Sequence, residues 1–395
     1  MPDSLERYLW EALSEFSKEK FVLLTGPRQV GKTTLAKQWL VSRNGTYLNW
    51  DIAVDRTEIL SSSFVKSPPN RVLVLDELHK YKKWKNWLKG LYDANAQSLE
   101  VVVTGSARLD IFQRGGDSLL GRHELLHLHP FSIAEISHHS VNPPPESWLE
   151  LQPLKKPTKE AWRALSEFGG FPEPFQKQSK IAYNRWANRR RELLIKEDLR
   201  ELTALKQLSL LEHLALLLPG KVGSPLSINS LVSDIQVKYD TLKSWIEVLE
   251  KLYFVYRISP YHKKLGRSLK KEKKLYLWDW AQVTDPGARF ENMVASHLYK
   301  AIQYWNDYGY GRFELCYWRD MEKNEVDFVI TKNQIPIVII ETKYSDETLS
   351  PSLFKLASML GGDLPLIQLV NTSQVDKRIK RTRVVSADSY LSGLI

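Results

Sequence analysis

Residues 21–34 read Phe-Val-Leu-Leu-Thr-Gly-Pro-Arg-Gln-Val-Gly-Lys-Thr-Thr, and this stretch decides the fold of the first part of the chain. Its apolar start, residues 21–24, predicts a buried strand, and residues 34–40 have a helical pattern. Between them, Gly26 and Gly31 let the backbone curl, so that its N–H groups and the helix N-terminus face an anion. The stretch therefore predicts a phosphate-binding loop between a strand and a helix.

The residue types of this loop suit a nucleoside triphosphate. Lys32 supplies a point charge for the β- and γ-phosphates and is also expected to act in catalysis, and the Thr33 hydroxyl is a ligand for Mg²⁺. We expect ATP as the bound nucleotide and Mg²⁺ as its metal ion. The predicted nucleotide-binding residues of the loop are Gly26, Pro27, Arg28, Gln29, Val30, Gly31, Lys32, Thr33 and Thr34.

Two further apolar stretches end in polar residues. The first is followed by Asp76, expected to hold Mg²⁺, and by Glu77, expected to polarise the attacking water as a catalytic residue. The second precedes Thr104 and Ser106. Either of these two residues senses the γ-phosphate, or both belong to a plain turn.

Five apolar stretches, separated by segments long enough for crossover helices, predict a parallel sheet with helices on both faces. They are residues 21–24, 47–50, 72–75, 101–103 and 125–128. Arg122 stands just before the last of them. It is predicted either to reach the ATP site of a neighbouring subunit as a catalytic residue or to be a surface arginine. The first interpretation implies a homo-oligomer, such as a ring.

Together these motifs resemble a family of bacterial and archaeal AAA+ ATPases in which an AAA+ core precedes a C-terminal domain of unknown function. The matching motifs are the loop at 26–34, Leu75-Asp-Glu-Leu-His, Thr104-Gly-Ser-Ala, Gly121-Arg, His129-Pro-Phe-Ser and Gly169-Gly-Phe-Pro-Glu. The resemblance covers nearly the whole chain. It implies an AAA+ core over residues 1–137, followed by a linker and helical lid over residues 138–200.

Residues 201–284 predict a winged-helix domain, because three helical patterns are followed by two strands joined by a polar loop. Residues 263–274 contain seven Lys or Arg against Glu272. A recognition helix and a basic wing would bind DNA with these side chains, and the alternative is a solvated loop or a helix docked on another domain. The predicted DNA-binding residues are Lys238, Lys243, Lys263, Lys264, Arg267, Lys270, Lys271, Lys273 and Lys274.

A predicted hairpin near the C-terminus carries charged side chains on apolar strands. If residues 332–334 form its loop, Asp327 pairs with Ile339 and Glu325 faces Glu341. Carboxylates this close repel one another, and a divalent metal would relieve the repulsion. The odd-numbered charged residues, which share one face of the hairpin, are Glu325, Asp327, Glu341 and Lys343.

This arrangement resembles the PD-(D/E)xK nuclease core, in which an acidic residue on a preceding helix completes the site, and Glu291 matches that residue. The resemblance implies a restriction-endonuclease-like α/β module over residues 285–395. In it, Glu291, Asp327 and Glu341 would bind Mg²⁺ or Mn²⁺, and Lys343 would join Asp327 and Glu341 as a catalytic residue. An active nuclease and a fold kept for assembly or DNA binding both stay open.

The composition agrees with a DNA partner and argues against several other classes. The 395 residues carry a net charge of +10, which favours a polyanion such as DNA. No apolar stretch is long enough to span a bilayer, and the N-terminus lacks the features of a signal peptide, so we expect a cytoplasmic protein without membrane attachment. Cys316 is the single cysteine, which excludes an internal disulfide.

The leading hypothesis is an ATP-dependent, DNA-binding AAA+ ATPase. Mg-ATP hydrolysis would drive remodelling of DNA, including branched DNA, while the C-terminal module cuts or grips it. The alternative is a nucleotide-switch ATPase that assembles with a protein partner in signalling or defence, with the nuclease-like fold as a non-catalytic scaffold. Stimulation of ATP turnover by DNA would favour the first hypothesis.

Overall fold

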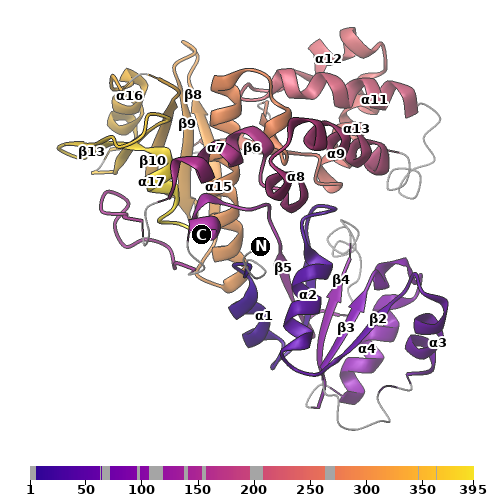
Figure 1. Cartoon of the computed structure of the whole chain (residues 1–395). Helices are drawn as coiled ribbons and strands as arrows, with labels where there is room; N and C mark the ends of the chain where they lie inside the picture. The colour runs from indigo at the N-terminus through magenta and orange to yellow at the C-terminus, as the bar shows by residue number, and fades with distance from the viewer. Residues whose placement is uncertain are drawn as a thin grey trace. The chain divides into compact units, whose positions relative to one another are not determined.

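The computed structural model describes residues 6–62, 64, 72–95, 98–105, 119–137, 141–153, 157–195, 208–262, 272–345, 347–361 and 363–395. The chain divides into two compact units, Met1–His129 and Pro130–Ile395. Each unit is built on its own sheet (Figure 1).

The first unit contains a five-stranded parallel sheet in the order β2-β3-β4-β1-β5. All five predicted strands are confirmed. They are β1 (Phe21–Thr25), β2 (Thr46–Asn49), β3 (Val72–Asp76), β4 (Glu100–Thr104) and β5 (His123–His127). Since β4 lies between β1 and β3, and parallel strands end at the same edge of a sheet, the residues that follow these three strands meet there.

Helices pack on this sheet because β1 and β3 are buried along their whole length. The helical elements are α1 (Trp10–Phe16), α2 (Lys32–Val41), α3 (Ala53–Ser61), η2 (Leu78–Lys80) and α4 (Trp84–Asn95). Leu88 and Leu91 of α4 join Leu73 and Val101 of the sheet in one apolar core. On α2, Trp39 is fully buried.

The second unit begins with a group of helices, of which the first lies at the end of the predicted AAA+ core and the other three lie in the region expected to hold the lid. They are α6 (Ile133–Ser137), α7 (Lys159–Phe168), α8 (Pro172–Lys177) and α9 (Lys180–Leu193). The hydroxyls of Thr158 and Ser179 accept hydrogen bonds from the backbone N–H groups of Ala161 and Ala182. These caps satisfy donors that the first turns of α7 and α9 would otherwise leave unpaired.

Three helices and an antiparallel strand pair follow, in the order predicted for residues 201–284. They are α11 (Leu208–Leu217), with the short η5 (Leu218–Lys221) after it, α12 (Ile228–Ile235), α13 (Tyr239–Lys251), β6 (Val255–Pro260) and β7 (Lys274–Leu277). The strand pair does not stand alone. Through Ser259 and Pro260, β6 also pairs in parallel with β8 (Phe313–Arg319). It therefore belongs to the sheet of the C-terminal module.

That sheet has eight strands in the order β12-β13-β11-β10-β9-β8-β6-β7. Its remaining elements, with the helices that pack beside it, are η6 (Trp280–Gln282), α15 (Pro286–Tyr308), β8 (Phe313–Arg319), β9 (Glu325–Lys332), β10 (Ile335–Lys343), α16 (Pro351–Leu360), β11 (Leu366–Val370), β12 (Asp376–Ile379), β13 (Thr382–Ser386) and α17 (Ala387–Leu391). The two regions predicted as separate domains, 201–284 and 285–395, therefore share one sheet.

The β9–β10 hairpin differs from its predicted register. Its turn has two residues, Asn333 and Gln334, with φ of 51° and 68°, so the three-residue loop was wrong. A β-bulge between Pro336 and Val338 shifts the register by one more residue, and Ile339 pairs with Val329 instead of Asp327. Two shifts of one residue preserve parity, so the odd-numbered charged side chains still share a face.

Candidate functional site

The loop between β1 and α2 has the backbone of an anion-binding site. Gln29 and Gly31 are in left-handed conformations, with φ of 65° and 102°, and Gly31 is the N-cap of α2. At Gly26, φ is 138° and a Cβ atom would lie 2.3 Å from the carbonyl oxygen of Leu128, so only glycine fits. The Lys32 ammonium donates to the carbonyl oxygens of Gly26 and Pro27, at 2.9 and 2.8 Å.

Asp76, at the end of β3, collects hydroxyl groups from three other elements. The Thr33 hydroxyl donates to it at 3.0 Å and the Tyr47 hydroxyl at 2.6 Å, and the Thr104 hydroxyl also donates to it. Burial, together with the neighbouring Asp76 carboxylate, raises the pKa of Tyr47. The predicted residues Thr33, Asp76 and Thr104 therefore meet at one point beside the loop, while Ser106 lies outside the described residues.

Glu77 follows Asp76 in a left-handed conformation, with φ of 56°. Its carboxylate lies 3.2 Å from the Lys80 ammonium and 3.8 Å from Nε2 of His79. Burial lowers the pKa of Lys80, but the ion pairs with Asp51 and Glu77 outweigh this, so the pKa is raised. The Glu77 carboxylate is thus held by an ion pair with Lys80, one residue after Asp76 in the chain.

Mg²⁺ fits the donor set beside this loop. A threonine hydroxyl and an aspartate carboxylate are hard oxygen ligands of the kind that Mg²⁺ prefers alongside phosphate oxygens. Thr33 and Asp76 already lie within hydrogen-bond distance of each other.

Arg122 lies at the opposite end of the sheet from the loop of its own chain. It directly precedes β5, whose first residue pairs with Phe21, whereas the loop follows Thr25 at the far end of β1. Five residues of strand separate the two ends by roughly 16 Å. The guanidinium binds the Asp93 carboxylate through Nε at 2.6 Å and Nη2 at 3.5 Å, and this ion pair raises the pKa of Arg122.

The predicted DNA-binding residues fall into three groups. Lys238, Lys243 and Lys273 are exposed. Lys274 is fully buried, so it is not available to a phosphate and its predicted role is corrected below. The basic residues that lie outside the described residues are Lys263, Lys264, Arg267, Lys270 and Lys271.

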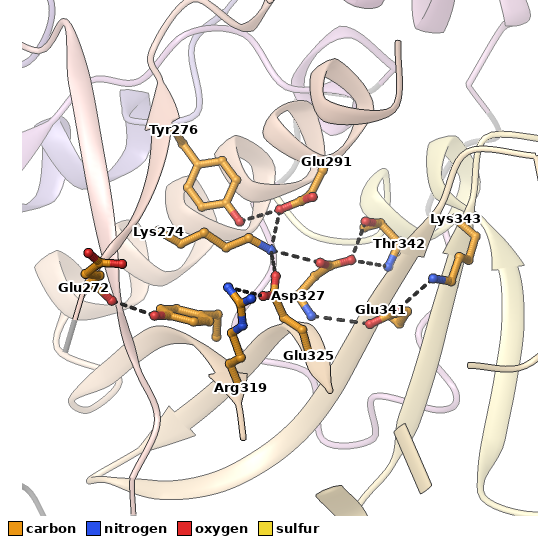
Figure 2. Close-up of polar contacts among 11 residues, drawn as sticks. Glu272, Lys274, Tyr276, Glu291, Arg319, Glu325, Asp327, Glu341, Thr342 and Lys343 are labelled. Atoms are coloured by element: carbon orange, nitrogen blue, oxygen red, sulfur yellow. Dashed lines mark hydrogen bonds and ion pairs between the residues drawn. The ribbon is translucent and has the colours of Figure 1, made fainter. Parts of the chain in front are cut away.

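The ammonium of Lys274 lies among the carboxylates predicted to bind metal (Figure 2). Its Nζ is 2.8 Å from Glu291, 2.7 Å from Glu325 and 3.0 Å from Asp327. Glu341 instead pairs with Lys343, at 2.9 Å. We call Glu291, Glu325, Asp327 and Glu341 the carboxylate cluster.

Hydrogen bonds complete this arrangement. The Tyr276 hydroxyl donates to Glu291 at 2.7 Å, and the N–H and hydroxyl of Thr342 donate to Asp327 at 2.9 and 2.6 Å. The Asp327 N–H donates to Glu341 at 3.4 Å, as expected for residues opposite each other in the observed register. The oxygen atoms of the cluster are thus held by cations and donors of the protein itself.

The pKa values of the cluster follow from burial and from these charges. Burial and the charge of Asp327 raise the pKa of Glu291 to about 7 and that of Glu341 to about 7. Burial opposes ionisation of Asp327 as well, but Lys274 and the bonds from Thr342 outweigh it and lower its pKa. Burial also opposes the charge on Lys274, yet the carboxylates hold its pKa well above the usual value.

The predicted metal site does not fit this geometry. The repulsion that a metal ion was expected to relieve is already relieved by Lys274, whose ammonium lies where the carboxylates converge. Among the described residues, no group of three or more His, Cys, Asp or Glu is arranged to hold a metal ion. Glu291, Asp327 and Glu341 are therefore parts of an ion-pair cluster in this structure.

Sequence reasoning missed Tyr47, Tyr276 and the position of Lys274. Tyr47 belonged to a predicted strand, and a hydroxyl on a strand beside the Asp76 strand was the available signal. The signal for Lys274 was its position at the start of the second predicted strand of this region, where the side chain can point into the sheet instead of belonging to the predicted polar loop.

Along the part of the chain that the structure describes, no helix combines the length and the apolar character required to cross a membrane.

Two relatives are similar over most of the chain. An uncharacterized protein of Mycobacterium tuberculosis is 22% identical over 349 residues, which are 84% of this chain and 72% of the relative. An uncharacterized protein of Methanocaldococcus jannaschii is 25% identical over 387 residues, covering 86% of this chain and 78% of the relative.

Among solved structures, the ORC1 protein of Aeropyrum pernix in complex with DNA covers 74% of this chain and 94% of its own, at 14% identity and a TM-score of 0.34. The RuvB Holliday junction branch migration motor of Thermotoga maritima covers 63% of this chain and 88% of its own, at 16% identity and a TM-score of 0.29. At these scores the likeness carries no argument about function.

Three family models match consecutive parts of the chain. Residues 18–137 match an AAA domain, residues 159–283 a domain of unknown function (DUF8612) and residues 286–390 another domain of unknown function (DUF4143). The AAA match contains the nucleotide loop, Asp76, Glu77 and Arg122. The chain therefore carries an AAA-type P-loop ATPase domain, followed by two domains of unknown function.

Proposed function

We propose that this protein is an Mg-ATP-hydrolysing ATPase that binds DNA through the α11–β7 region and uses hydrolysis to remodel that DNA. The nucleotide part rests on the meeting of Lys32, Thr33 and Asp76 at one edge of the sheet. Thr33 and Asp76 would hold Mg²⁺, which supplies charge neutralisation for the phosphates. Glu77, beside them, orients and polarises the attacking water.

The two faces of α13 carry the DNA part of the proposal. Leu242, Trp245 and Leu249 are buried, so the helix packs by one side. Lys238, the N-cap residue, and Lys243, in the second turn, are both exposed at its N-terminal end. A helix that follows two others and presents lysines at its first turns suits insertion in a DNA groove with phosphate contacts. The net charge of +10 adds a general attraction to a polyanion.

We also propose that the ATPase works as an oligomer. Arg122 is separated from the loop of its own chain by the length of β5, so it cannot reach the phosphates bound there. Its position at the opposite end of the sheet suits a contact with the loop of a neighbouring subunit. There it would stabilise charge on the phosphates during hydrolysis.

The test measures ATP turnover and DNA affinity with duplex, single-stranded and junction DNA at several salt concentrations. Lys238→Ala/Lys243→Ala should weaken binding and reduce the salt slope, because each phosphate contact contributes about 0.9 to that slope. The matched control is Lys377→Ala/Lys380→Ala, which removes two exposed lysines from the β12 region. If the two variants lose DNA affinity equally, the effect comes from net charge alone, and a specific role for α13 is contradicted.

A second candidate function is a nucleotide switch with a protein partner. The observation that favours it is the carboxylate cluster, whose internal pairing with Lys274 and Lys343 suits a scaffold and not a metal-dependent nuclease. The same experiment separates the two functions. DNA that raises ATP turnover supports the remodelling ATPase, and turnover that is indifferent to every DNA supports the switch.

A further inference from the structure

Lys274 joins two parts of the second unit that are distinct in sequence. It is the first residue of β7, in the strand pair that follows α13. The carboxylates that it contacts belong to α15 and β9, in the C-terminal module. The side chain has no exposed surface, so it belongs to the interior of the second unit.

The three contacts have the geometry of a cation among its ligands. Oxygen atoms of Glu291, Glu325 and Asp327 converge on Nζ at distances from 2.7 to 3.0 Å (Figure 2). An ammonium buried without partners costs several kcal/mol, and so does a group of carboxylates without a cation. Each side of the cluster therefore requires the other, and truncating the lysine leaves carboxylates that need a replacement cation.

The same three carboxylates also contact other side chains, but among the described residues only Lys274 contacts all three of them. Tyr276 binds Glu291, Thr342 binds Asp327, and Arg319 lies 3.6 Å from Glu325. Arg319 is partly exposed and contacts the outer side of the cluster. Lys343 pairs with Glu341.

We propose that Lys274 is the resident cation of the carboxylate cluster, in the position where a divalent metal ion would bind, and that it ties β7 to α15 and β9 without any metal. The cluster is then a latent divalent-cation site. The ammonium occupies this site in the parent protein and excludes Mn²⁺. When the ammonium is removed, oxygen ligands of three side chains remain oriented toward one point and can bind Mn²⁺.

The test adds Mn²⁺ alone to the nucleotide-free, full-length protein. Thr33→Ala is present in every sample to keep the metal away from the nucleotide loop. Calorimetry and electron paramagnetic resonance measure binding, and thermal unfolding measures stability. Without Lys274→Ala, we expect no Mn²⁺ uptake that depends on Asp327. Without metal, the protein with Lys274→Ala should melt at a lower temperature than the Thr33→Ala protein. It should bind Mn²⁺ about tenfold or more tightly than the Thr33→Ala protein, and it should regain stability when Mn²⁺ is added.

Two controls identify the site. Adding Asp327→Asn to Lys274→Ala should abolish the gained Mn²⁺ binding. Lys300→Ala removes another buried lysine, paired with Glu135 at 2.6 Å, and should lower stability without creating Mn²⁺ binding.

Several outcomes would overturn the proposal. One is Mn²⁺ bound in the presence of Lys274 and lost on Asp327→Asn, since the metal would then be the resident cation. Another is a Lys274→Ala protein that gains no Mn²⁺ binding or is as stable as its parent without metal. If Lys274→Ala accumulates only as unfolded protein, refolding it with and without Mn²⁺ decides. Recovery that depends on Mn²⁺ supports the proposal, and failure in both conditions contradicts it.

Discussion

The nucleotide loop and the carboxylate cluster contain the same kinds of side chain and arrange them in opposite ways. At the loop, the Lys32 ammonium donates to backbone carbonyl oxygens, and the Asp76 carboxylate accepts from hydroxyl groups. In the cluster, the Lys274 ammonium binds three carboxylates directly. In the first site, the lysine and the aspartate each bind uncharged groups. In the second site, the lysine and the carboxylates bind each other.

The difference follows from what surrounds each lysine. A glycine-containing loop and a helix N-terminus offer N–H groups to an anion, so an external polyanion would complete the candidate nucleotide site. Around Lys274, the carboxylates pair with ammonium groups and accept from hydroxyl and N–H groups of the same chain. One site thus requires a ligand to be complete, and the other is complete within the chain.

A mixing experiment would test whether the nucleotide site is incomplete even within one subunit. Arg122→Ala should lower ATP turnover by about a thousandfold, because an arginine that stabilises phosphate charge contributes this much or more. Lys32→Ala should be equally inactive because ATP binding is weakened. Mixed oligomers of the two should recover part of the activity, since some interfaces pair an intact loop with an intact arginine. No recovery in proven mixed oligomers would remove Arg122 from the site.

Glutamate-to-glutamine substitutions in the two regions should have different effects on ATP turnover. Glu77→Gln should lower turnover by about a hundredfold or more while ATP affinity is retained, because it removes the group that polarises water. Glu291→Gln replaces a carboxyl whose pKa is near 7 with an amide of the same shape, and turnover should be unchanged. Both values come from a steady-state ATPase assay with nucleotide binding measured separately. Parent-level turnover in Glu77→Gln would reject Glu77 as the residue that polarises the attacking water.

The smallest expected effect concerns a buried group that is kept neutral, unlike Lys274. The ring of His297 donates from Nδ1 to the Met293 carbonyl and accepts from the Ile133 N–H through Nε2. Burial lowers its pKa from 6.5 to about 4. As the pH falls from 6.5 toward 4, the unfolded state takes up a proton before the folded state does, so up to about 3 kcal/mol of stability is lost.

Denaturant unfolding at pH 7 and pH 5 measures this effect. His297→Gln keeps an acceptor for Ile133 but does not titrate, so its stability should change less between the two pH values. The control His213→Gln, at an exposed histidine of α11, should keep the pH dependence of the parent. An unaltered dependence in His297→Gln would assign the acid sensitivity to other groups.

Much of the fold was predictable from local patterns. The strands of the first unit are apolar runs with turn residues at their ends, and the loop at 26–34 has a characteristic spacing, so both were evident without tertiary information. The register of the β9–β10 hairpin was not. It depended on a two-residue turn of Asn333 and Gln334 and on a bulge at Pro336, and neither has a strong signal in a single sequence.

The sequence by itself predicted the candidate nucleotide site, because residues 26–34 lie within one strand–loop–helix unit and Asp76 ends a buried strand. Only the tertiary structure decided the nature of the C-terminal cluster. Lys274 lies 17 residues before Glu291 and 53 before Asp327 along the chain, and in the sequence it is the last of a run of basic residues. Strand pairing in the shared sheet brings its ammonium to the carboxylates, and that contact, not the residue types, is why the cluster does not fit a metal ion.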